Sequence, residues 1–419
     1  MKIAIVGTGI SGLMAAHLLH SEHEIAVFEA SDRLGGHAHT VAVEEGSRRL
    51  AIDTGFIVFN DRNYPNFERL LAELGVAHRP SHMSFSVSDG RGDFEYSGTP
   101  RGLFARPAHL LSPSFLGMLR EWRRFNREAR GLIGMNGTAP SLGAWLEQRG
   151  FSRNFVERLI VPQASAVWSA DPAQMWSFPA SFMAEFFENH GMYSLRGRPR
   201  WRTVAGGSTS YVEAISAPWR DRVRLRSPVM RIERLPDHVR IAAAGSGWED
   251  FDRVVIATHS DQALALLGDP SAAERDVLGA IPYQRIEGVL HTDVSLLPRR
   301  RAAWSSWNFH LTERPAGRTT VTYWMNNLQG LRGRRQYLLT LNRGEEIDPA
   351  RVLGRFTYEH PVYTREGVAA QARRAEIDGA RRTHYCGAYW GWGFHEDGVL
   401  SAMRTCEGLA AEPEMALAA

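Results

Sequence analysis

The chain begins with Lys2-Ile3-Ala4-Ile5-Val6-Gly7-Thr8-Gly9-Ile10-Ser11-Gly12, and this stretch sets the architecture of the rest. It predicts a short apolar strand that turns on glycines into a helix ending near Leu19. Gly7 allows the tight turn, Gly9 lets the backbone approach a pyrophosphate, and Gly12 lets the helix pack on the strand. The helix N-terminus, at Ser11, stabilises negative charge. The stretch therefore predicts a dinucleotide-binding unit.

A second predicted strand, residues 24–28, ends in Glu29. An acidic side chain at this point accepts hydrogen bonds from both hydroxyls of an adenosine ribose and repels a 2′-phosphate. NADP is therefore disfavoured, and FAD and NAD remain. A glycine motif alone is also found in ordinary turns. Here the strand, the helix and the acidic residue all fall where a dinucleotide needs them, so we favour the dinucleotide interpretation.

The residues that follow distinguish FAD from NAD. Arg33-Leu34-Gly35-Gly36-His37 lies a few residues past Glu29, and it resembles the extended fingerprint of the FAD-dependent amine oxidase and phytoene desaturase superfamily. In that superfamily the arginine and the two glycines hold the diphosphate. The resemblance implies that the cofactor is FAD.

At 419 residues with 44% hydrophobic content, the chain can bury a large core and is expected to form two joined domains. The resemblance implies an α/β fold: a Rossmann-like FAD-binding domain of the glutathione-reductase type and a discontinuous α+β substrate domain. We assign residues 1–60, 200–262 and 375–412 to the first and residues 61–199 and 263–374 to the second. Residues 413–419 are expected to form a flexible tail.

Later motifs complete the expected FAD site. The segment after Asp53 resembles the superfamily segment that passes beside the isoalloxazine, and residues 384–401 resemble its last FAD motif, in which the acidic residue, here Asp397, holds the ribitol. A simple helix N-cap is the alternative for Asp397. The cofactor-binding residues expected in total are Gly7, Gly9, Ser11, Gly12, Glu29, Ala30, Arg33, Gly35, Gly36, His37, Thr54, Gly55, Val229, Thr258, Gly387, Asp397, Gly398 and Val399.

Three residues are candidates for catalysis. His395 and Glu396 are the only adjacent acid-base groups at the flavin end, and a histidine is easily set for proton transfer near neutral pH. A hydrogen-bonding role in a loop is the alternative for His395. Tyr323 opens the stretch 323–329 that we expect to face the ligand, although an edge strand with a polar turn fits that stretch equally well. We expect no metal site.

The basic residues have an unusual makeup. Lys2 is the only lysine, so 48 of the 49 basic residues are arginines, and the net charge is +3. Many amine oxidases of this superfamily use a lysine that holds a water near flavin N5, and none is available here. The composition therefore argues against orthodox amine oxidase chemistry, and nothing in it favours nucleic acid as a partner.

The cellular setting is expected to be the cytoplasm. Cys386 and Cys406 form no CxxC pair, which suits a reducing compartment. The apolar N-terminus contains the glycine fingerprint, so its removal as a signal peptide would destroy the cofactor site. No uncharged apolar run approaches the roughly 20 residues of a membrane-spanning helix.

Residues 101–190 are expected to form a helical lobe rich in aromatic side chains, which suits an apolar ligand. Within it, residues 114–133 alternate apolar positions with five arginines at helical spacing. Such a helix can lie apolar face down on an anionic membrane. The alternative, which we prefer modestly, is a helix that faces the core and exposes its basic side to solvent. Peripheral contact with the inner membrane face remains open.

Five motifs define a narrower resemblance: LGGHAHTV (34–41), DTGFIVFN (53–60), NYPNF (63–67), TYWMNNLQ (322–329) and CGAYWGWGFHEDG (386–398). Together they are similar to the bacterial predicted NAD/FAD-binding proteins associated with cyclopropane fatty-acid synthases, and to the flavoprotein domain fused to the plant cyclopropane synthases. The resemblance implies an FAD-dependent oxidoreductase that modifies unsaturated or methyl-branched acyl chains of membrane lipids, including oxidation toward furan fatty acids, and a fatty-acid methyltransferase as a partner. We expect oxygen to reoxidise the flavin.

Three alternatives stay open. The first is a flavin amine oxidase, which the missing lysine disfavours. The second is a carotenoid-type desaturase or isomerase, which has the same fold. The third is a non-catalytic flavoprotein that supports a lipid methyltransferase.

Overall fold

A five-stranded parallel sheet carries the N-terminal motif of this computed structural model, which describes residues 1–135, 139–194, 196–312 and 317–411. The tail expected over residues 413–419 lies outside the described residues. Strand β1 (Lys2–Val6) lies between β2 (Glu24–Phe28) and β14 (Arg253–Ile256), and β10 (Val223–Arg224) and β20 (Thr383–Tyr385) form the edges. The strand, turn and helix predicted at the N-terminus are confirmed.

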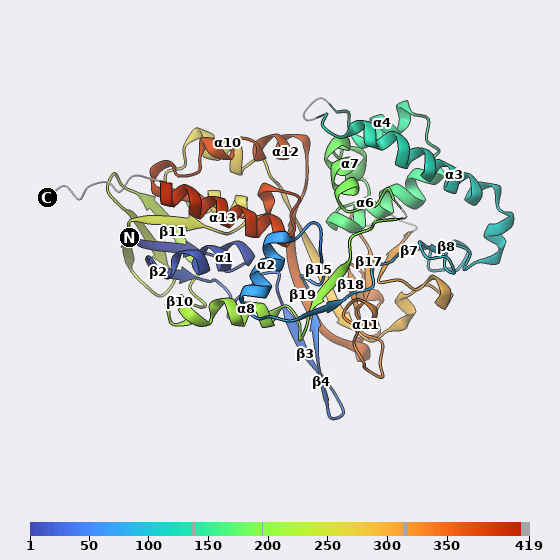
Figure 1. Ribbon diagram of the computed structural model, residues 1–419, viewed down its shortest axis with the longest axis horizontal. Helices are drawn as coiled ribbons and strands as arrows, with labels where there is room; N and C mark the ends of the chain where they lie inside the picture. The colour runs from blue at the N-terminus through green and yellow to red at the C-terminus, as the bar shows by residue number, and fades with distance from the viewer. Residues whose placement is uncertain (136–138, 195, 313–316, 412–419) are drawn as a thin grey trace.

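Both faces of this sheet are buried, as is usual for parallel sheets. Side chains alternate along a strand, so Ile3 and Ile5 enter one core and Ala4 and Val6 enter the other. The first core is formed with α1 (Ile10–Leu19), α2 (Pro65–Glu73), α8 (Thr209–Ser216) and α13 (His395–Ala411). Figure 1 shows α13, α1 and α2 next to one another in the left half of the molecule.

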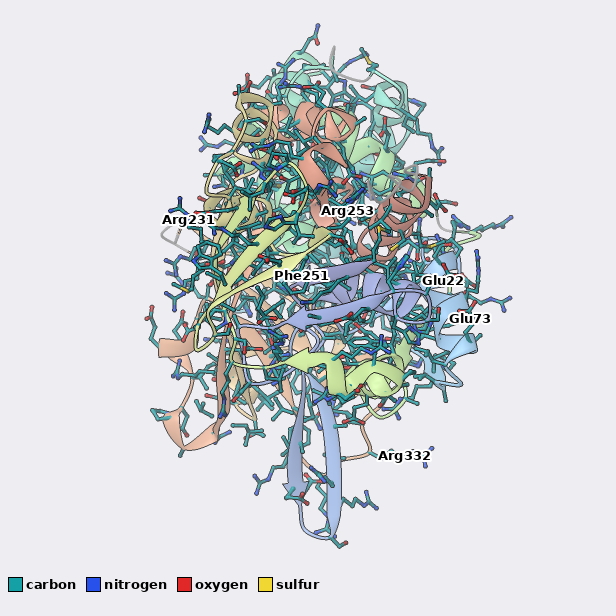
Figure 2. The ribbon with its side chains drawn as sticks, turned by 90° about the vertical axis from the view of Figure 1, so that its left-hand side faces the viewer. Glu22, Glu73, Arg231, Phe251, Arg253 and Arg332 are labelled. Carbon is teal, nitrogen blue, oxygen red and sulfur yellow. The ribbon has the colours of Figure 1, made fainter. Side chains whose placement is uncertain are left out.

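The second core lies under a three-stranded antiparallel sheet and two helices. These elements are β11 (Val229–Arg234), β12 (Val239–Ala243), β13 (Trp248–Phe251), α9 (Ser260–Leu266) and α10 (Ala272–Leu278). Phe251, labelled in Figure 2, is fully buried at the end of β13. The Lys2 ammonium lies 4.6 Å from the centre of the Phe251 ring. Contacts of this kind connect the antiparallel sheet to the first strand of the parallel one.

A seven-stranded sheet forms the second half of the molecule. Its order is β19-β15-β18-β17-β16-β7-β8, antiparallel except where β16 and β7 run parallel. The strands are β7 (Phe85–Ser88), β8 (Glu95–Ser97), β15 (Tyr283–His291), β16 (Trp307–His310), β17 (Val321–Trp324), β18 (Leu338–Leu341) and β19 (Val352–Pro361).

A helical lobe covers this sheet and forms the upper right of Figure 1. It contains α3 (Pro113–Glu128), α4 (Leu142–Gln148), α5 (Arg153–Phe155), α6 (Val161–Trp168) and α7 (Ala180–Asn189), with a π-helical turn over Val156–Ile160. The helical character predicted for residues 101–190 is confirmed. Phe115, Met118 and Phe125 of α3 are buried in the lobe, so the apolar face of this helix is not available to a membrane.

Small elements connect the two halves. One sheet pairs β5 (Phe59–Asn60) and β6 (His78–Pro80) with β9 (Trp201–Val204). Strands β3 (Thr40–Glu45) and β4 (Arg48–Asp53) form a hairpin that projects from the body in both views. Arg48 donates to the carbonyl oxygen of Arg332, which Figure 2 labels beside the hairpin (2.7 Å). The remaining helices are α11 (Met325–Leu328) and α12 (Arg365–Gln371).

Three helices lie on a different side of the expected domain boundaries. We expected residues 61–199 and 263–374 in the substrate domain. However, α2 contributes Phe67, Leu70 and Leu71 to the core around α1. Val277 and Leu278 of α10, and Ala370 of α12, belong to the other core of the parallel sheet. Buried apolar faces assign these segments to the FAD-binding half.

Among the described residues, no helix has both the length and the hydrophobicity that crossing a membrane requires.

Candidate cofactor and substrate site

One continuous cavity of about 1330 Å³ runs from the glycine-rich turn after β1 into the helical lobe. Ligand pockets usually span roughly 300–1,000 Å³, so this cavity has room for a large cofactor together with a second molecule. At one end it is lined by glycine backbone, and at the other by aromatic and aliphatic side chains. The two ends call for different ligands.

The glycine-rich end has the geometry that a dinucleotide needs. Gly7 adopts a φ of +98°, and its N–H donates to the Phe28 carbonyl (2.8 Å), which holds the turn against β2. Glu29 follows β2, and its carboxylate accepts hydrogen bonds from the backbone N–H groups of Thr8 (3.1 Å) and Ser31 (2.8 Å). These bonds fix a carboxylate at the wall of the cavity, where the ribose of an adenine nucleotide would lie.

Two observations test whether FAD fits here. A Cβ added to Gly9 would meet nothing within 4 Å, so the space beside this glycine is open to a ligand. The Nε2 atom of His37 is buried and has no hydrogen-bond partner among the described residues, which leaves it for a cofactor atom. In addition, the N-terminal residues Ile10 and Ser11 of α1 and His395 of α13 line the cavity, so both helix dipoles stabilise negative charge there.

The structure places most of the predicted cofactor residues on the cavity wall. Those that line it are Gly7, Gly9, Ser11, Glu29, Ala30, Gly35, Gly36, His37, Thr54, Gly55, Val229, Thr258 and Gly387. The others, Gly12, Arg33, Asp397, Gly398 and Val399, lie behind this wall. Gly12 packs on the turn, because a Cβ there would lie 1.9 Å from the Gly7 oxygen.

Arg33 supports the wall from behind. Its guanidinium donates to the carbonyl oxygens of Gly36 (2.8 Å) and Ala38 (3.2 Å), so it holds the Gly35-Gly36 turn in shape. Asp397 is the third residue of α13 and accepts a hydrogen bond from the N–H of Phe394, the residue before the helix (2.9 Å), so it stabilises the helix start without being the N-cap residue considered as the alternative. Burial raises the pKa of Asp397 to about 7, against opposing hydrogen bonds from backbone N–H groups.

His395 lies on the cavity wall as an uncharged ring. It stacks on Phe56 with ring centres 3.5 Å apart, and its Nε2 pairs with the Tyr211 hydroxyl (3.0 Å). Burial lowers its pKa to about 3, so the ring stays neutral between about pH 5 and pH 8. In this state the imidazole can donate one hydrogen bond and accept another, but it lacks the second, acidic proton of an imidazolium and so cannot act as a general acid.

This neutrality gives a prediction for His395→Phe. The pH profile of kcat/KM should keep the shape and apparent pKa values of the parent protein, whatever the loss of rate, because the ring does not titrate in this range. Tyr211→Phe, which breaks the same hydrogen bond and keeps both rings, serves as the control. An ionisation near pH 6.5 that disappears only in His395→Phe would contradict the assignment.

The structure gives Glu396 a role other than the catalytic one expected. Its carboxylate accepts hydrogen bonds from the backbone N–H groups of Asn66 (3.0 Å) and Phe67 (2.9 Å) and from the Asn66 side chain (2.7 Å). Glu396 therefore caps the N-terminus of α2 and does not line the cavity. The residues that bind Glu396 lie at the start of α2, 330 positions away in the sequence, so the residues next to Glu396 do not predict this role.

Tyr323 lines the lobe end of the cavity as expected. Its ring packs edge-on against Trp307, with centres 5.1 Å apart. Burial raises its pKa to about 12, opposed by a hydrogen bond with Ser169, so the hydroxyl keeps its proton at neutral pH. Tyr323 can therefore donate a hydrogen bond to a ligand or position one.

Sequence reasoning missed two groups of cavity residues. Tyr358, Glu359 and His360 lie on β19, whose alternating residues 352–360 carry the usual signal of a strand. Tyr363 follows that strand and stacks on Phe182, with ring centres 4.9 Å apart. Its buried hydroxyl has no hydrogen-bond partner among the described residues and lies beside Gly393, just before α13. No local pattern points to Tyr363, because the contacts that bury it come from distant segments.

No group of three histidine, cysteine, aspartate or glutamate side chains suited to a metal ion occurs in the described part of the chain.

A Rossmann-like sheet, a dinucleotide turn with a ribose-binding carboxylate, and a large cavity between two domains define an FAD-dependent oxidoreductase. The family model of the flavin containing amine oxidoreductases matches residues 10–340. The chain belongs to this family, and its cofactor is FAD.

Individual relatives are more distant. A protein of Mycobacterium tuberculosis assigned as a flavin-containing monoamine oxidase, AofH, is 26% identical over 293 residues, which are 64% of this chain and 59% of that protein. The chain thus spans about three fifths of this relative's length.

Two solved structures share the fold over nearly the whole chain. Cyclohexylamine oxidase of Brevibacterium oxydans is 18% identical, with a TM-score of 0.70 and coverage of 98% of this chain and 99% of the other. A fatty acid isomerase of P. acnes that produces CLA is 15% identical, with a TM-score of 0.65 and 97% coverage of each chain. At these identities the likeness concerns the fold alone.

Proposed function

We propose that this flavoprotein oxidises an apolar, lipid-derived substrate: an unsaturated or methyl-branched acyl chain. The observation that carries the proposal is the composition of the cavity at its lobe end. The walls there are almost continuously apolar and include Leu103, Leu119, Trp122, Leu159, Val167, Trp168, Phe186, Ile286, Trp307, Leu339 and Leu341. Such walls favour a hydrocarbon by removing its surface from water, at roughly 25 cal/mol per Å².

The charged groups of the cavity also disfavour a cationic amine. Within the described residues, the only carboxylates that line it are Glu29, at the glycine-rich turn, and Glu359, whose carboxylate lies 3.6 Å from His259. Among the residues that the structure describes, no carboxylate lines the lobe end to pair with an ammonium group, and transfer of an unpaired charge into an apolar site is costly. The single lysine, Lys2, lies at the start of β1 and does not line the cavity.

FAD, when bound, accepts the electrons that the substrate loses. The chain's own residues exclude water and position the substrate. Trp392 and Phe394 come from the segment before α13, and Tyr363 comes from the segment after β19, so aromatic rings enclose the region between the FAD-binding turn and the lobe. Tyr323 lines the cavity and stays protonated, so its hydroxyl can donate a hydrogen bond to the substrate.

The narrower sequence resemblance supports the acyl-chain substrate and a fatty-acid methyltransferase as partner. A flavin amine oxidase is the second candidate, because the family name and the AofH relative favour it. The two candidates differ in the charge of the substrate, which makes them separable by experiment.

The test is the visible spectrum of the FAD-loaded protein under anaerobic conditions. We expect unsaturated or methyl-branched fatty acids or phospholipids to bleach the oxidised flavin, and benzylamine and putrescine to leave it unchanged. Product analysis would then locate the oxidised carbon atoms. Bleaching by an amine with no response to any acyl substrate would overturn the proposal in favour of an amine oxidase.

Contact with an anionic membrane surface is part of the same proposal. Because the apolar face of α3 is buried, this contact would use its exposed arginines and the exposed Leu110 and Leu111 just before the helix. Arg120→Glu combined with Arg127→Glu should reduce sedimentation with phosphatidylglycerol vesicles and leave the melting temperature unchanged. Arg124 is unsuitable, because its guanidinium lies 4.0 Å above the Phe151 ring and donates to the Arg149 carbonyl. Unaltered sedimentation of the double variant would contradict membrane contact through α3.

A further inference from the structure

The charges at the lobe end of the cavity have one sign. Of the charged side chains that line the cavity, Arg123 belongs to the lobe and Arg198 to the segment that follows it, and within the described residues no carboxylate accompanies Arg123 in the lobe. Arg123 projects from α3, next to Trp122 and one turn after Leu119, which also line the cavity. Arg198 belongs to the segment between α7 and β9. An apolar chamber with arginines at its lobe end resembles a site for a hydrocarbon that carries an acidic group.

Arg123 and Arg120 are the two arginines of α3 whose side chains make no contact with a partner among the described residues, and only Arg123 lines the cavity. Arg124 donates to a backbone carbonyl and lies over Phe151, Arg127 lies 3.9 Å from Glu128, and Arg130 pairs with Glu188 (2.9 Å). Arg123 makes no hydrogen bond or ion pair within the part of the chain that the structure describes. Its side chain is exposed, so the guanidinium stays solvated at the cavity wall until a ligand arrives.

A second polar side chain faces the same space. Gln163 projects from α6 into the cavity, is only partly exposed, and also makes no hydrogen bond within the described residues. Arg198 has its Nε bonded to the Ser194 carbonyl (2.7 Å), which orients its guanidinium. A carboxylate has two oxygens and accepts several hydrogen bonds, so guanidinium and amide donors suit it well.

We propose that Arg123 binds the carboxylate of an otherwise apolar substrate and so anchors it with its hydrocarbon part in the aromatic chamber. The proposal rests on the proposed function in one respect: it names the class of substrate, an apolar carboxylic acid. The proposal also predicts how the substrate is oriented in the cavity. The acidic group stays with α3 at the lobe end, and the hydrocarbon extends toward Trp392 and Phe394 before α13. An apolar acid of this kind is either a free fatty acid or a carboxylate-bearing tetrapyrrole.

The experiment measures binding to the FAD-loaded protein by quenching of tryptophan fluorescence, since Trp122, Trp168 and Trp307 line the cavity. The ligands are oleate below its micelle concentration, methyl oleate and coproporphyrin. Arg123→Gln should weaken oleate binding by about tenfold or more, since a charge-assisted hydrogen bond is lost, and should leave methyl oleate unchanged. Arg120→Gln is the matched control: Arg120 is one turn earlier, exposed, and away from the cavity wall.

The outcomes separate the two proposals. If Arg123→Gln weakens oleate alone, a fatty acid is the ligand; if it weakens coproporphyrin alone, the anchor stands and the tetrapyrrole is the source. If oleate binding depends on Arg123 while no acyl substrate bleaches the flavin, carboxylate binding by Arg123 is supported and the proposed function fails. Equal affinity of the parent protein for oleate and methyl oleate, or an equal loss of both ligands in Arg123→Gln, overturns the anchor whatever the flavin does.

Discussion

Gly9→Val is expected to fold normally and to purify without FAD. The backbone of Gly9 has φ −61° and ψ 176°, which any L-residue adopts, and a Cβ there would touch nothing within 4 Å. The fold therefore tolerates the side chain. The same open space faces the cavity where the cofactor's diphosphate approaches the turn, so the valine would occupy it. Overlap of this kind costs about 1–3 kcal/mol, which weakens FAD binding by about 10- to 100-fold.

Gly12→Val is the matched variant for this experiment. A Cβ at Gly12 would lie 1.9 Å from the Gly7 oxygen and 3.2 Å from the Ala257 Cβ, so it would force the turn and helix α1 away from the sheet. We expect this variant to lose thermal stability as well as FAD. Flavin absorbance per mole of protein, FAD titration and thermal unfolding of the apoprotein would distinguish the two effects. Gly9→Val that binds FAD with parental affinity would show that the diphosphate does not lie beside this glycine.

Glu274→Gln is expected to lower the free energy of unfolding by about 3 kcal/mol, because it leaves the charge of Arg234 buried with only one of its two acidic partners. The Arg234 side chain is 0% exposed and that of Glu274 is 1% exposed. Arg234 donates to both Glu274 oxygens and, through Nε, to Asp269 (3.0 Å). Glu274 also accepts hydrogen bonds from the Tyr385 hydroxyl (2.7 Å) and the Ser271 N–H (2.7 Å). This network connects β11, α10 and β20 beneath the FAD-binding sheet.

The pKa of Glu274 also predicts how the stability of the protein depends on pH. Burial alone raises the pKa of Glu274, but the hydrogen bonds from Arg234, Ser271 and Tyr385 outweigh it and lower the pKa from 4.5 to about 2. A carboxylate whose pKa is lower in the folded state stabilises the protein above its unfolded pKa. That contribution is present above pH 4.5 and is lost as the pH falls from 4.5 toward 2.

Urea unfolding at several pH values measures both effects. The parent protein should lose the Glu274 contribution in the acidic range, and Glu274→Gln should lack that part of the pH dependence. Glu376→Gln is the control, since Glu376 forms an exposed ion pair with Arg373 (2.8 Å) and should leave stability unchanged. Equal urea midpoints for Glu274→Gln and the parent at neutral pH would show that the buried pair contributes nothing.

The cofactor half of the site could be predicted because its information is local. Position 7 must be glycine because its φ is positive, and position 12 must be glycine because helix and turn lie in close contact there. Glu29 is recognised from its position directly after β2. These requirements involve about thirty consecutive residues, and only a few residue types satisfy them. The helical periodicity of the lobe is a local signal too, and α3 to α7 confirm it.

The role of individual polar side chains depends on contacts between distant segments. Glu396 reaches the start of α2 at Asn66, and Asp53 bonds to Gln329 across the two halves (2.8 Å). No spacing in the chain encodes such pairs. The boundary between the halves could not be predicted for the same reason, since α10 and α12 join the FAD-binding core through buried faces that any core could accept.

The sequence alone determines a dinucleotide-binding unit with a Rossmann-like fold, because the conformations that bind a dinucleotide are properties of short segments, and its resemblance to the amine oxidase superfamily implies that the dinucleotide is FAD. The shape and charge of the substrate chamber come from the tertiary structure. Arg123 of α3, Tyr323 of β17 and Tyr363 after β19 meet in one cavity only when the lobe has packed on the seven-stranded sheet. The physical reason is range: backbone conformation depends on neighbouring residues, whereas burial and pairing of a side chain depend on segments hundreds of residues apart.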